Sequence, residues 1–258
     1  MRSAESLPPV LIFDLDGTIL RTNSFPLWMV HLMIGRIPEL DLRQRVSLSI
    51  KTMRLLLSRK IGRLGHDELQ RRLQMVWQAA IAGSRLPMTN HYATRLLRLV
   101  RPNIGALLSL MVERQFDAVL ATAAAADYAE PLGRRLGFQH VLATRANRNA
   151  GEPANARAAK RRSVGDFLRH TGWCDRSLIL FTDHLDDLPL ILECDVVCWF
   201  GSAGMLATAR AMAAKSGFVH CRDMSPKMLQ ATVLGLCDYA AHSSVPRATG
   251  SLSEITVS

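Results

Sequence analysis

Two pairs of aspartates stand directly after apolar segments of this 258-residue chain. In LIFDLDGTIL, Asp14 and Asp16 are two residues apart, and in FTDHLDDLPLI, Asp183 ends an apolar run and Asp187 follows four residues later. If these side chains converge, bare carboxylates about 4 Å apart would repel one another by a few kcal/mol per pair. Mg²⁺ would neutralise them, because this hard ion is held by a few carboxylates, keeps several waters and accepts phosphate oxygens. The two segments therefore predict a Mg²⁺ site and phosphoryl-transfer chemistry.

Aspartates at strand ends and helix starts are also ordinary capping residues, and capping alone would explain Asp186 and Asp187. Two such clusters, each directly after an apolar strand, favour a functional site, because ligands of parallel α/β folds bind beyond the carboxyl ends of the strands. The residues that end the apolar strands are therefore the first candidates: Asp14, Thr122, Thr144 and Asp183.

Strands and helices alternate over the second half of the chain, and these elements must position the candidates. Short apolar runs predict strands at residues 9–14, 116–122, 140–144, 177–183 and 195–200. Helical periodicity predicts helices at residues 104–114, 126–136 and 157–171, and one from about Asp187. The alternation predicts an α/β fold with a parallel sheet covered by helices on both faces.

The segment between the first two strands shows only helical periodicity, interrupted by prolines and glycines, which predicts about four helices. It is far longer than the dozen or so residues that a crossover requires. We therefore expect residues 22–100 to form an inserted helical cap over the strand ends, and residues 1–21 and 101–242 to form the α/β core. Residues 243–258, which are rich in serine and threonine, are expected to be a disordered tail.

One expected cap helix, LRQRVSLSIKTMRLLLSRK, is amphipathic and basic. Its apolar side contains Val46, Ile50, Met53, Leu56 and Leu57, and its basic residues lie largely elsewhere: Arg43, Lys51, Arg54 and Arg59. The whole chain has a net charge of +10 and a pI near 10.0. This charge suggests an anionic partner, which could be a phosphorylated substrate, nucleic acid or an acidic lipid surface. Charge alone does not choose between these and a merely basic solvated surface.

The composition excludes several classes of protein. A hydrophobic fraction of 48% supports a sizeable core. No apolar run reaches the roughly 18 to 20 residues of a membrane helix, and the N-terminus lacks the apolar segment of a secretory signal, so a cytoplasmic protein is expected. The five cysteines include no CxxC pair, which predicts buried reduced thiols rather than a disulfide framework or a zinc site.

Three segments resemble motifs of the haloacid-dehalogenase (HAD) superfamily: DLDGT resembles motif I, FDAVLAT motif II and TDHLDDLPLI motif IV. The helical insert between motifs I and II, together with EPLGRRLGF followed by HVLATR, is similar to the phosphoserine-phosphatase-like (IB-type) subfamily. The resemblance covers about residues 9–22 and 115–220. It implies a Rossmann-like parallel-sheet core with a C1-type α-helical cap.

The resemblance further implies a Mg²⁺-dependent phosphatase that forms an aspartyl-phosphate intermediate. Asp14 would be the nucleophile and a metal ligand, and Asp16 would protonate the leaving group and then deprotonate the hydrolytic water. Their spacing places both beside one phosphoryl group, while Gly17 lets the chain turn out of the strand and Thr18 supports the loop. The dehalogenases of the superfamily lack the second aspartate, so its presence favours phosphate chemistry.

Other roles follow from the same resemblance. Motif III requires a basic residue at a helix start, for which Lys160 is preferred over Arg157 and Arg161. The expected phosphate contacts are Gly17, Thr18, Thr122, Ala123 and Lys160. The expected metal ligands are Asp14, Asp16, Asp183 and Asp187. His184 is expected to be a loop residue that faces solvent.

Three functions remain open at this point. The first is hydrolysis of a small phosphomonoester, although TAAAAD replaces the serine and glycines with which phosphoserine phosphatase holds its substrate, which argues against phosphoserine. The second is hydrolysis of a lipid phosphate at an acidic membrane surface, using apolar cap residues that would otherwise form the core of the cap: Trp28, Met29, Met33 and Met53. The third is a non-catalytic basic binding protein on the same fold. Aromatic residues make up only 6% and no nucleic-acid motif is present, so no specific nucleic-acid partner is expected.

Overall fold

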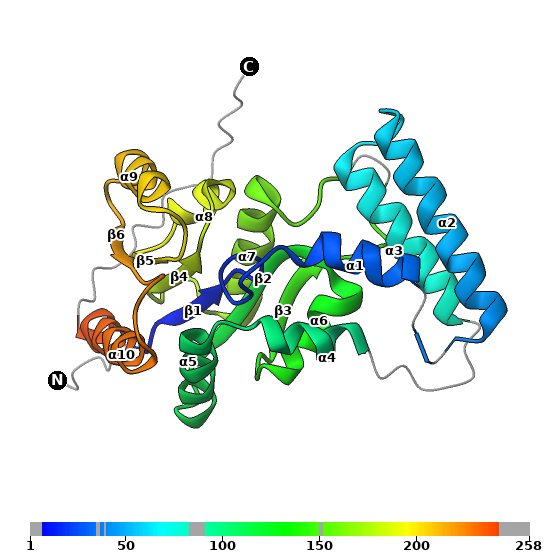
Figure 1. Ribbon diagram of the computed structural model, residues 1–258. Helices are drawn as coiled ribbons and strands as arrows, with labels where there is room; N and C mark the ends of the chain where they lie inside the picture. Colours follow the sequence, from blue (N-terminus) through cyan, green and yellow to red (C-terminus); the bar gives the residue numbers. More distant parts are fainter. Residues whose placement is uncertain (1–6, 35–36, 39, 83–90, 150–151, 243–258) are drawn as a thin grey trace, which may run out of the picture.

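A computed structural model describes residues 7–34, 37–38, 40–82, 91–149 and 152–242. Among these residues, six strands form one parallel sheet in the order β3-β2-β1-β4-β5-β6 (Figure 1). The strands are β1 (Val10–Phe13), β2 (Ala118–Ala125), β3 (His140–Thr144), β4 (Leu178–Thr182), β5 (Val196–Trp199) and β6 (Gly217–His220). The predicted α/β fold is confirmed, whereas the tail predicted for residues 243–258 lies outside the described residues.

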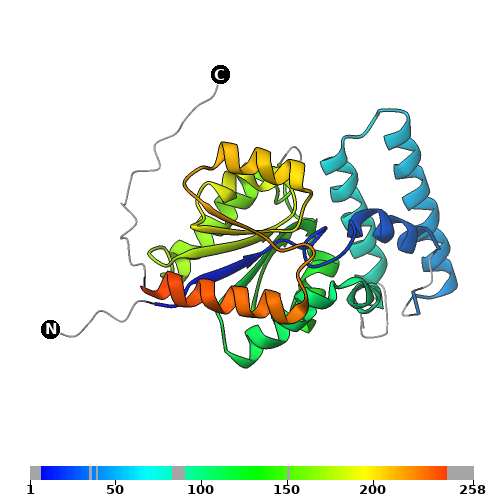
Figure 2. The same ribbon diagram turned by 60° about the vertical axis from the view of Figure 1, so that its left-hand side comes forward.

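Helices cover both faces of the sheet, as Figures 1 and 2 show. Side chains alternate along β1, so Leu11 and Phe13 join one hydrophobic cluster and Val10 and Ile12 join the other. The core helices that pack into the first cluster are α5 (Pro102–Glu113), α6 (Ala126–Arg135) and α10 (Pro226–His242). Those of the second cluster are α7 (Arg157–Thr171), α8 (Leu188–Ile191) and α9 (Ala203–Met212).

Local sequence explains where several of these elements start and stop. All four residues of β1 are buried, as expected for a short apolar run between two helical layers. Pro102 occupies the first turn of α5, where its missing N–H is not needed. Gly172 ends α7 in a left-handed conformation with φ of 73°, a position that glycine adopts without strain.

The second strand is longer than predicted. The sequence places its end at Thr122, but β2 continues to Ala125. Ala121 pairs with Leu142 and Ala125 pairs with Thr144, so four residues of β2 span the distance of two residues of β3, and the extra residues form a bulge. Thr122 therefore lies inside the strand, at the irregularity, rather than at its last position.

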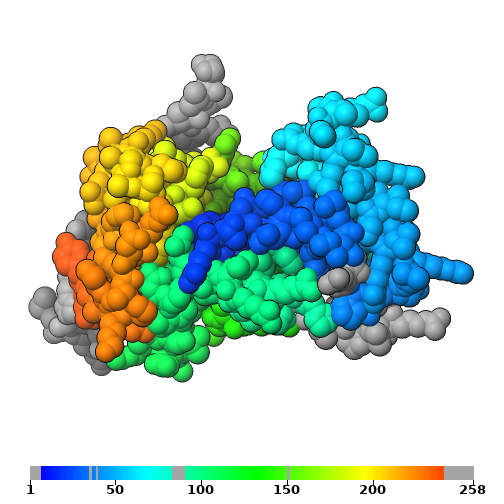
Figure 3. Space-filling model, viewed as in Figure 1, coloured from blue at the N-terminus to red at the C-terminus, as the bar shows by residue number. Residues whose placement is uncertain are grey.

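The helices between β1 and α5 lie toward one end of the molecule (Figures 1 and 3). They are α1 (Ser24–Ile34), α2 (Leu42–Lys60), α3 (His66–Ala82), α4 (His91–Leu96) and the short 3₁₀ helix η1 (Leu97–Leu99). Trp28 of α1 and Leu73 of α3 are buried in the same cluster as Phe13 of the sheet. This helical segment, with the predicted number of α-helices among the described residues, thus packs directly onto the core.

Three elements after residue 200 were not predicted, namely α9, β6 and α10. The helix predicted from about Asp187 consists of a 3₁₀ turn, η2 (Leu185–Asp187), followed by α8. Within the described part of the chain, no helix combines the length and the apolar character needed to cross a membrane. The cysteines form no disulfide, and four of the five are buried.

Candidate active site

The candidate site lies at the carboxyl ends of the central strands. β1 pairs with β4 on one side and with β2 on the other, so the residues that follow these strands meet at one edge of the sheet. Asp14 follows β1, and its N–H donates to the carbonyl of Phe181 in β4 at 2.9 Å. Asp183 follows β4, and Thr122 reaches the same edge from β2. The strand order therefore brings the predicted motifs together.

Lys160 joins the two aspartate clusters. It stands in the first turns of α7, and its Nζ lies 2.7 Å from Oδ1 of Asp14 and 2.6 Å from Oδ1 of Asp187, with a side chain only 4% exposed. The second oxygen of Asp187, Oδ2, accepts a hydrogen bond of 2.7 Å from the Thr182 hydroxyl. Burial alone would lower the pKa of Lys160, but Asp14 and Asp187 raise it above its ordinary value. The ammonium therefore stays charged between two carboxylates.

Burial makes it unfavourable to ionise all the carboxylates of this cluster. It raises the pKa of Asp14 to about 8, an effect that Lys160 opposes and that Asp187 and Asp183 increase. Burial is also the main cause of the raised pKa of Asp183. One ammonium thus does not offset the carboxylates around it, and an added cation would favour their charged forms.

Asp16 is held by the first residue of α1. Its Oδ1 accepts the Ser24 N–H at 2.8 Å, and its Oδ2 accepts the Ser24 hydroxyl at 3.1 Å. The Ser24 oxygen is also hydrogen-bonded to the Tyr128 hydroxyl at 2.9 Å. Burial raises the pKa of Asp16 to about 6, while both hydrogen bonds from Ser24 act to lower it. Asp16 can therefore carry a proton near neutral pH, as a general acid must.

Gly17 allows the loop after β1 to approach the loop after β4. Its φ is +80°, and a Cβ at this position would lie 2.0 Å from Oδ2 of Asp183. Thr18 donates from its hydroxyl to Oδ1 of Asp183 at 3.5 Å, and Arg101 donates to the Gly17 carbonyl at 2.9 Å. Only a residue without a side chain leaves the Asp183 carboxylate where it is.

Thr122 and Ala123 belong to the bulge of β2. The Thr122 hydroxyl accepts the N–H of Ala124 at 3.1 Å, and the Thr122 carbonyl accepts from the Asn155 amide at 3.1 Å. The Ala123 carbonyl accepts from the Gln70 amide and from the Thr144 hydroxyl, both at 2.8 Å. These contacts fix the main chain of the bulge beside the end of β1.

The other charged residues singled out in the sequence lie outside the buried cluster. Arg157 is exposed and pairs with Asp186 at 3.0 Å, and Arg161 is partly exposed and pairs with Glu193 at 2.9 Å. His184 is 57% exposed and accepts the N–H of Asp186 at 3.1 Å. Of the three basic residues weighed for motif III, Lys160 is the one whose side chain enters the cluster.

Several residues of the site were not found from the sequence. Thr182 could have been found, because it is a polar residue at the end of an apolar strand, the same signal that identified Asp183. Ser24, Tyr128 and Asn155 carry no such signal, because each reaches the site through a contact between elements far apart in the chain.

The donor set fits Mg²⁺ through two carboxylates. Both carboxylate oxygens of Asp16 accept from Ser24, and those of Asp187 contact Lys160 and Thr182. Asp14 and Asp183 use Oδ1 in their contacts with Lys160 and Thr18, so the Oδ2 atoms of these two residues are the donors. No group of three His, Cys, Asp or Glu side chains in the described ranges could hold a metal by itself. Mg²⁺ in phosphoryl-transfer sites is commonly bound by one or two carboxylates, waters and substrate phosphate, so two donors suffice.

Comparison with protein-family models matches residues 11–192, more than half of the chain, to the haloacid dehalogenase-like hydrolases. Comparison with curated protein sequences gives no significant match.

Solved structures share the fold at low sequence identity. A Bordetella pertussis Tohama I protein of unknown function aligns with a TM-score of 0.60 and 18% identity, covering 83% of this chain and 99% of its own. A substrate-bound phosphoserine phosphatase aligns with a TM-score of 0.51 and 10% identity, covering 90% of this chain and 99% of its own. A probable phosphoserine phosphatase from Vibrio cholerae aligns with a TM-score of 0.51 and 9% identity, covering 90% of this chain and 67% of its own. Identities this low support a common fold and nothing further.

Proposed function

Because the chain belongs to the haloacid dehalogenase-like hydrolase family, we propose that it is a Mg²⁺-dependent phosphatase that hydrolyses a small phosphorylated metabolite through an aspartyl-phosphate intermediate. The observation that carries this proposal is the buried contact of Lys160 with Asp14, on the same loop as Asp16. This arrangement combines a nucleophilic carboxylate, a fixed positive charge and a second carboxyl group whose pKa is near 6.

In the first step, a carboxylate oxygen of Asp14 attacks phosphorus, and the bond between phosphorus and the leaving-group oxygen breaks. Asp16, in its protonated form, donates its proton to that oxygen, so the product leaves as an alcohol. The Lys160 ammonium offsets negative charge on the phosphoryl oxygens as the bonds rearrange. Phosphate oxygens bind between the bulge at Thr122 and Ala123 and the loop at Gly17 and Thr18.

In the second step, Asp16 is a carboxylate and takes a proton from a water molecule, whose oxygen attacks phosphorus. The bond between phosphorus and the Asp14 oxygen breaks, which releases inorganic phosphate and restores the free carboxylate. The two hydrogen bonds from Ser24 stabilise Asp16 in the charged form that this step requires. One residue thus acts first as an acid and then as a base.

Asp14 and Asp183 would hold the Mg²⁺ ion. When bound, the ion would supply positive charge to the phosphoryl oxygens without a change of protonation. Asp187, whose oxygens contact Lys160 and Thr182, would keep the ammonium in place rather than bind the metal directly.

We also propose that residues 22–100 act as the cap that selects the substrate. The Gln70 amide of α3 donates to the Ala123 carbonyl, and the Gln74 amide donates to the Thr144 carbonyl, both at 2.8 Å. These bonds hold α3 across the ends of β2 and β3. A helix placed there favours a small substrate enclosed beside the loops over a polymer.

The test is hydrolysis of an aryl phosphate with Mg²⁺ and with a chelator, for the wild type, Asp14→Asn and the control Asp186→Asn. The control makes the same change on an aspartate of the motif IV loop whose side chain is 48% exposed and lies outside the buried cluster. We expect turnover only with Mg²⁺, loss of activity by a factor of at least about 10³ in Asp14→Asn, and near-normal activity in the control.

A panel of phosphorylated metabolites then identifies the preferred substrate. Acid quenching after brief exposure to ³²P-labelled substrate should leave label on the wild type and none on Asp14→Asn. Near-normal turnover by Asp14→Asn, or turnover that persists in chelator, would refute the mechanism.

A further inference from the structure

Helix α2 carries a continuous row of exposed apolar side chains. The row recurs at helical spacing along the helix and ends at its C-cap residue, Ile61. Each member is 48% to 75% exposed: Leu42, Val46, Ile50, Met53, Leu57 and Ile61. Isolated exposed apolar residues are common on protein surfaces, but a contiguous row on one helix face marks an interaction site.

This row lies on the side of α2 that no described element covers. The buried residues of the helix, Leu48 and Thr52, lie on the opposite side, and α2 packs against α1 and α3. In Figures 1 and 3, α2 lies at the outer end of the molecule, away from α9 and α10. The arrangement reverses that of an ordinary surface helix, whose exposed face is polar.

The helix is also strongly basic. It has no acidic residue and six basic ones: Arg43, Arg45, Lys51, Arg54, Arg59 and Lys60. Arg45 and Arg59 donate to main-chain carbonyls, and no ion pair to a carboxylate involves α2 within the part of the chain that the structure describes. Among the described residues, the positive charges beside the apolar row therefore have no carboxylate partner.

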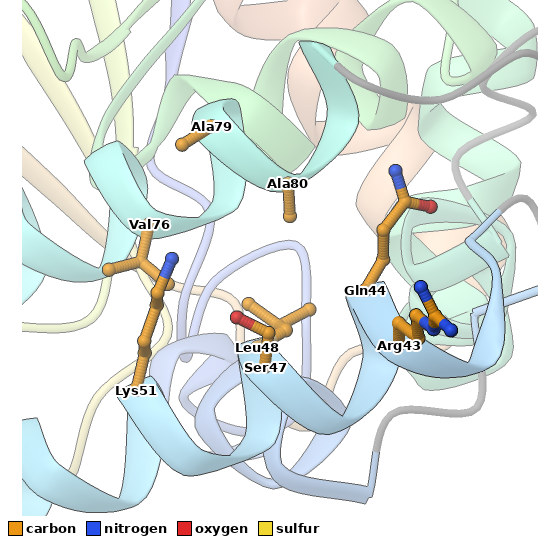
Figure 4. Close-up of a pocket in the computed structure, with 8 residues that line it drawn as sticks. All are labelled: Arg43, Gln44, Ser47, Leu48, Lys51, Val76, Ala79 and Ala80. Atoms are coloured by element: carbon orange, nitrogen blue, oxygen red, sulfur yellow. The ribbon is translucent and has the colours of Figure 1, made fainter.

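Two grooves place basic groups beside the apolar row. One, of about 540 Å³, is lined by Leu42, Val46 and Ile50 together with basic residues that include Arg54. The other, of about 290 Å³, lies between α2 and α3 and has Lys51 on its wall (Figure 4). Arg43 and Lys51 line both grooves, at the boundary between apolar surface and open solvent.

The combination of an apolar row with neighbouring cations indicates which kind of partner binds this face of α2. A second copy docked on this face by a two-fold axis would bring two sets of the same cations together, which is unfavourable. An anionic lipid surface offers acyl chains to the row and negative headgroups to the cations beside it, which is how basic amphipathic helices bind membrane interfaces. We infer that α2 docks this protein on anionic membrane surfaces, with its apolar row inserted among the lipids. The docking does not depend on the phosphatase reaction.

The first test is flotation of the full chain with vesicles of phosphatidylcholine containing about one quarter phosphatidylserine, against vesicles of phosphatidylcholine alone. We expect binding to the anionic vesicles, weakening as salt rises from about 0.1 to 0.5 M. Val46→Asp with Ile50→Asp should abolish it. Met212→Asp with Met228→Asp, which alters two similarly exposed apolar residues on α9 and α10, should leave binding unchanged.

A second pair of variants separates local from overall charge. Lys51→Glu with Arg54→Glu should lower the vesicle partition coefficient by a factor of at least about thirty. Each positive charge removed near an anionic surface lowers this coefficient roughly fivefold, and the pair removes two. Lys215→Glu with Lys227→Glu makes the same change in net charge on exposed residues elsewhere and should change binding far less. The melting curves of all variants should match that of the wild type, which shows that the substitutions leave the fold intact.

Three results would overturn the inference. The first is no binding of the wild type to anionic vesicles at low salt. The second is equal loss of binding in the α2 variants and their controls. The third is concentration-dependent self-association in ultracentrifugation that the α2 variants abolish, without vesicle binding, which would make this face a contact between copies of the chain. Phosphatase activity is measured separately, so its absence would not mimic any of these outcomes.

Discussion

Replacing Gly17 with alanine tests whether the Asp183 carboxylate has to lie against the main chain of the loop that carries Asp14. A Cβ at Gly17 would lie 2.0 Å from Oδ2 and 2.5 Å from Cγ of Asp183. No real Cβ approaches other atoms so closely, so the Asp183 side chain has to move. The change therefore displaces one expected metal ligand without altering its chemistry.

The backbone cost can be separated from the displacement by a matched variant. Gly17 has φ of +80° and Gly62 has φ of +77°, but a Cβ at Gly62 would meet no atom within 4 Å. Alanine in this left-handed conformation costs roughly 1–2 kcal/mol, so both variants should lower the free energy of unfolding by at least this amount. Only Gly17→Ala should lose activity, by about a hundredfold or more, as expected when a group in the site shifts by about 1 Å.

The assay combines urea unfolding of both variants with hydrolysis of an aryl phosphate at saturating Mg²⁺ and calorimetric titration of Mg²⁺. Gly17→Ala should bind Mg²⁺ more weakly than Gly62→Ala although both remain folded. If the two variants show the same activity and the same Mg²⁺ affinity, the position of the Asp183 carboxylate is not needed, and the proposed metal site is refuted.

Three further predictions concern charge in the site. Lys160→Met removes the ammonium between Asp14 and Asp187 and leaves these buried carboxylates unpaired. It should lower the free energy of unfolding in urea by about 3–5 kcal/mol and should also abolish activity. A variant as stable as the wild type would contradict this role of Lys160. Ser24→Ala removes the hydroxyl that donates to Asp16, a hydrogen bond that lowers the pKa of Asp16. The pKa of Asp16 should therefore rise, and the alkaline limb of the pH profile of kcat/KM should move up by about one pH unit. An unmoved limb would show that Asp16 is not the acid. Without metal, thermal stability should fall as the pH rises from about 4 to about 8. The folded-state pKa of Asp14 is raised from 3.8 to about 8, so its protonated form stabilises the fold at low pH, and this stabilisation is lost as the pH rises through that range. Mg²⁺ should then raise Tm more at about pH 8 than at about pH 5, and a larger effect at the lower pH would contradict the assignment of Asp14 as a ligand.

Most core elements could be predicted because their sequence patterns are local. β3 and α7 have the predicted bounds, and β1, β4 and β5 agree within one residue at each end. β2 runs past Thr122 because its bulge depends on pairing with β3 and on the Asn155 amide, which no local pattern reveals. β6 was missed because this edge strand is only partly buried and begins with a glycine, so it lacks a clear apolar run.

The site could be predicted only as far as strand order determines it. Asp14 and Asp183 directly follow strands that pair with each other, so the rule for strand ends was enough to place them at one edge. The partners of Asp16 could not be predicted, since the hydroxyls of Ser24 and Tyr128 meet across 104 residues of sequence. The contact of Asp187 with Lys160 likewise depends on how α7 packs against the η2 turn.

The balance of charge explains why these contacts converge on one ammonium. Lys160 contacts Asp14 and Asp187, while Asp183 raises the pKa of Asp14 further, so one positive charge faces three buried or half-buried carboxylates. Without another cation the cluster favours a proton on Asp14, and a protonated carboxyl group is a poor nucleophile. A phosphate monoester would bring still more negative charge to the same place. A divalent cation between Asp14 and Asp183 would favour ionised Asp14 and attract the phosphate, so metal and substrate should each strengthen the binding of the other.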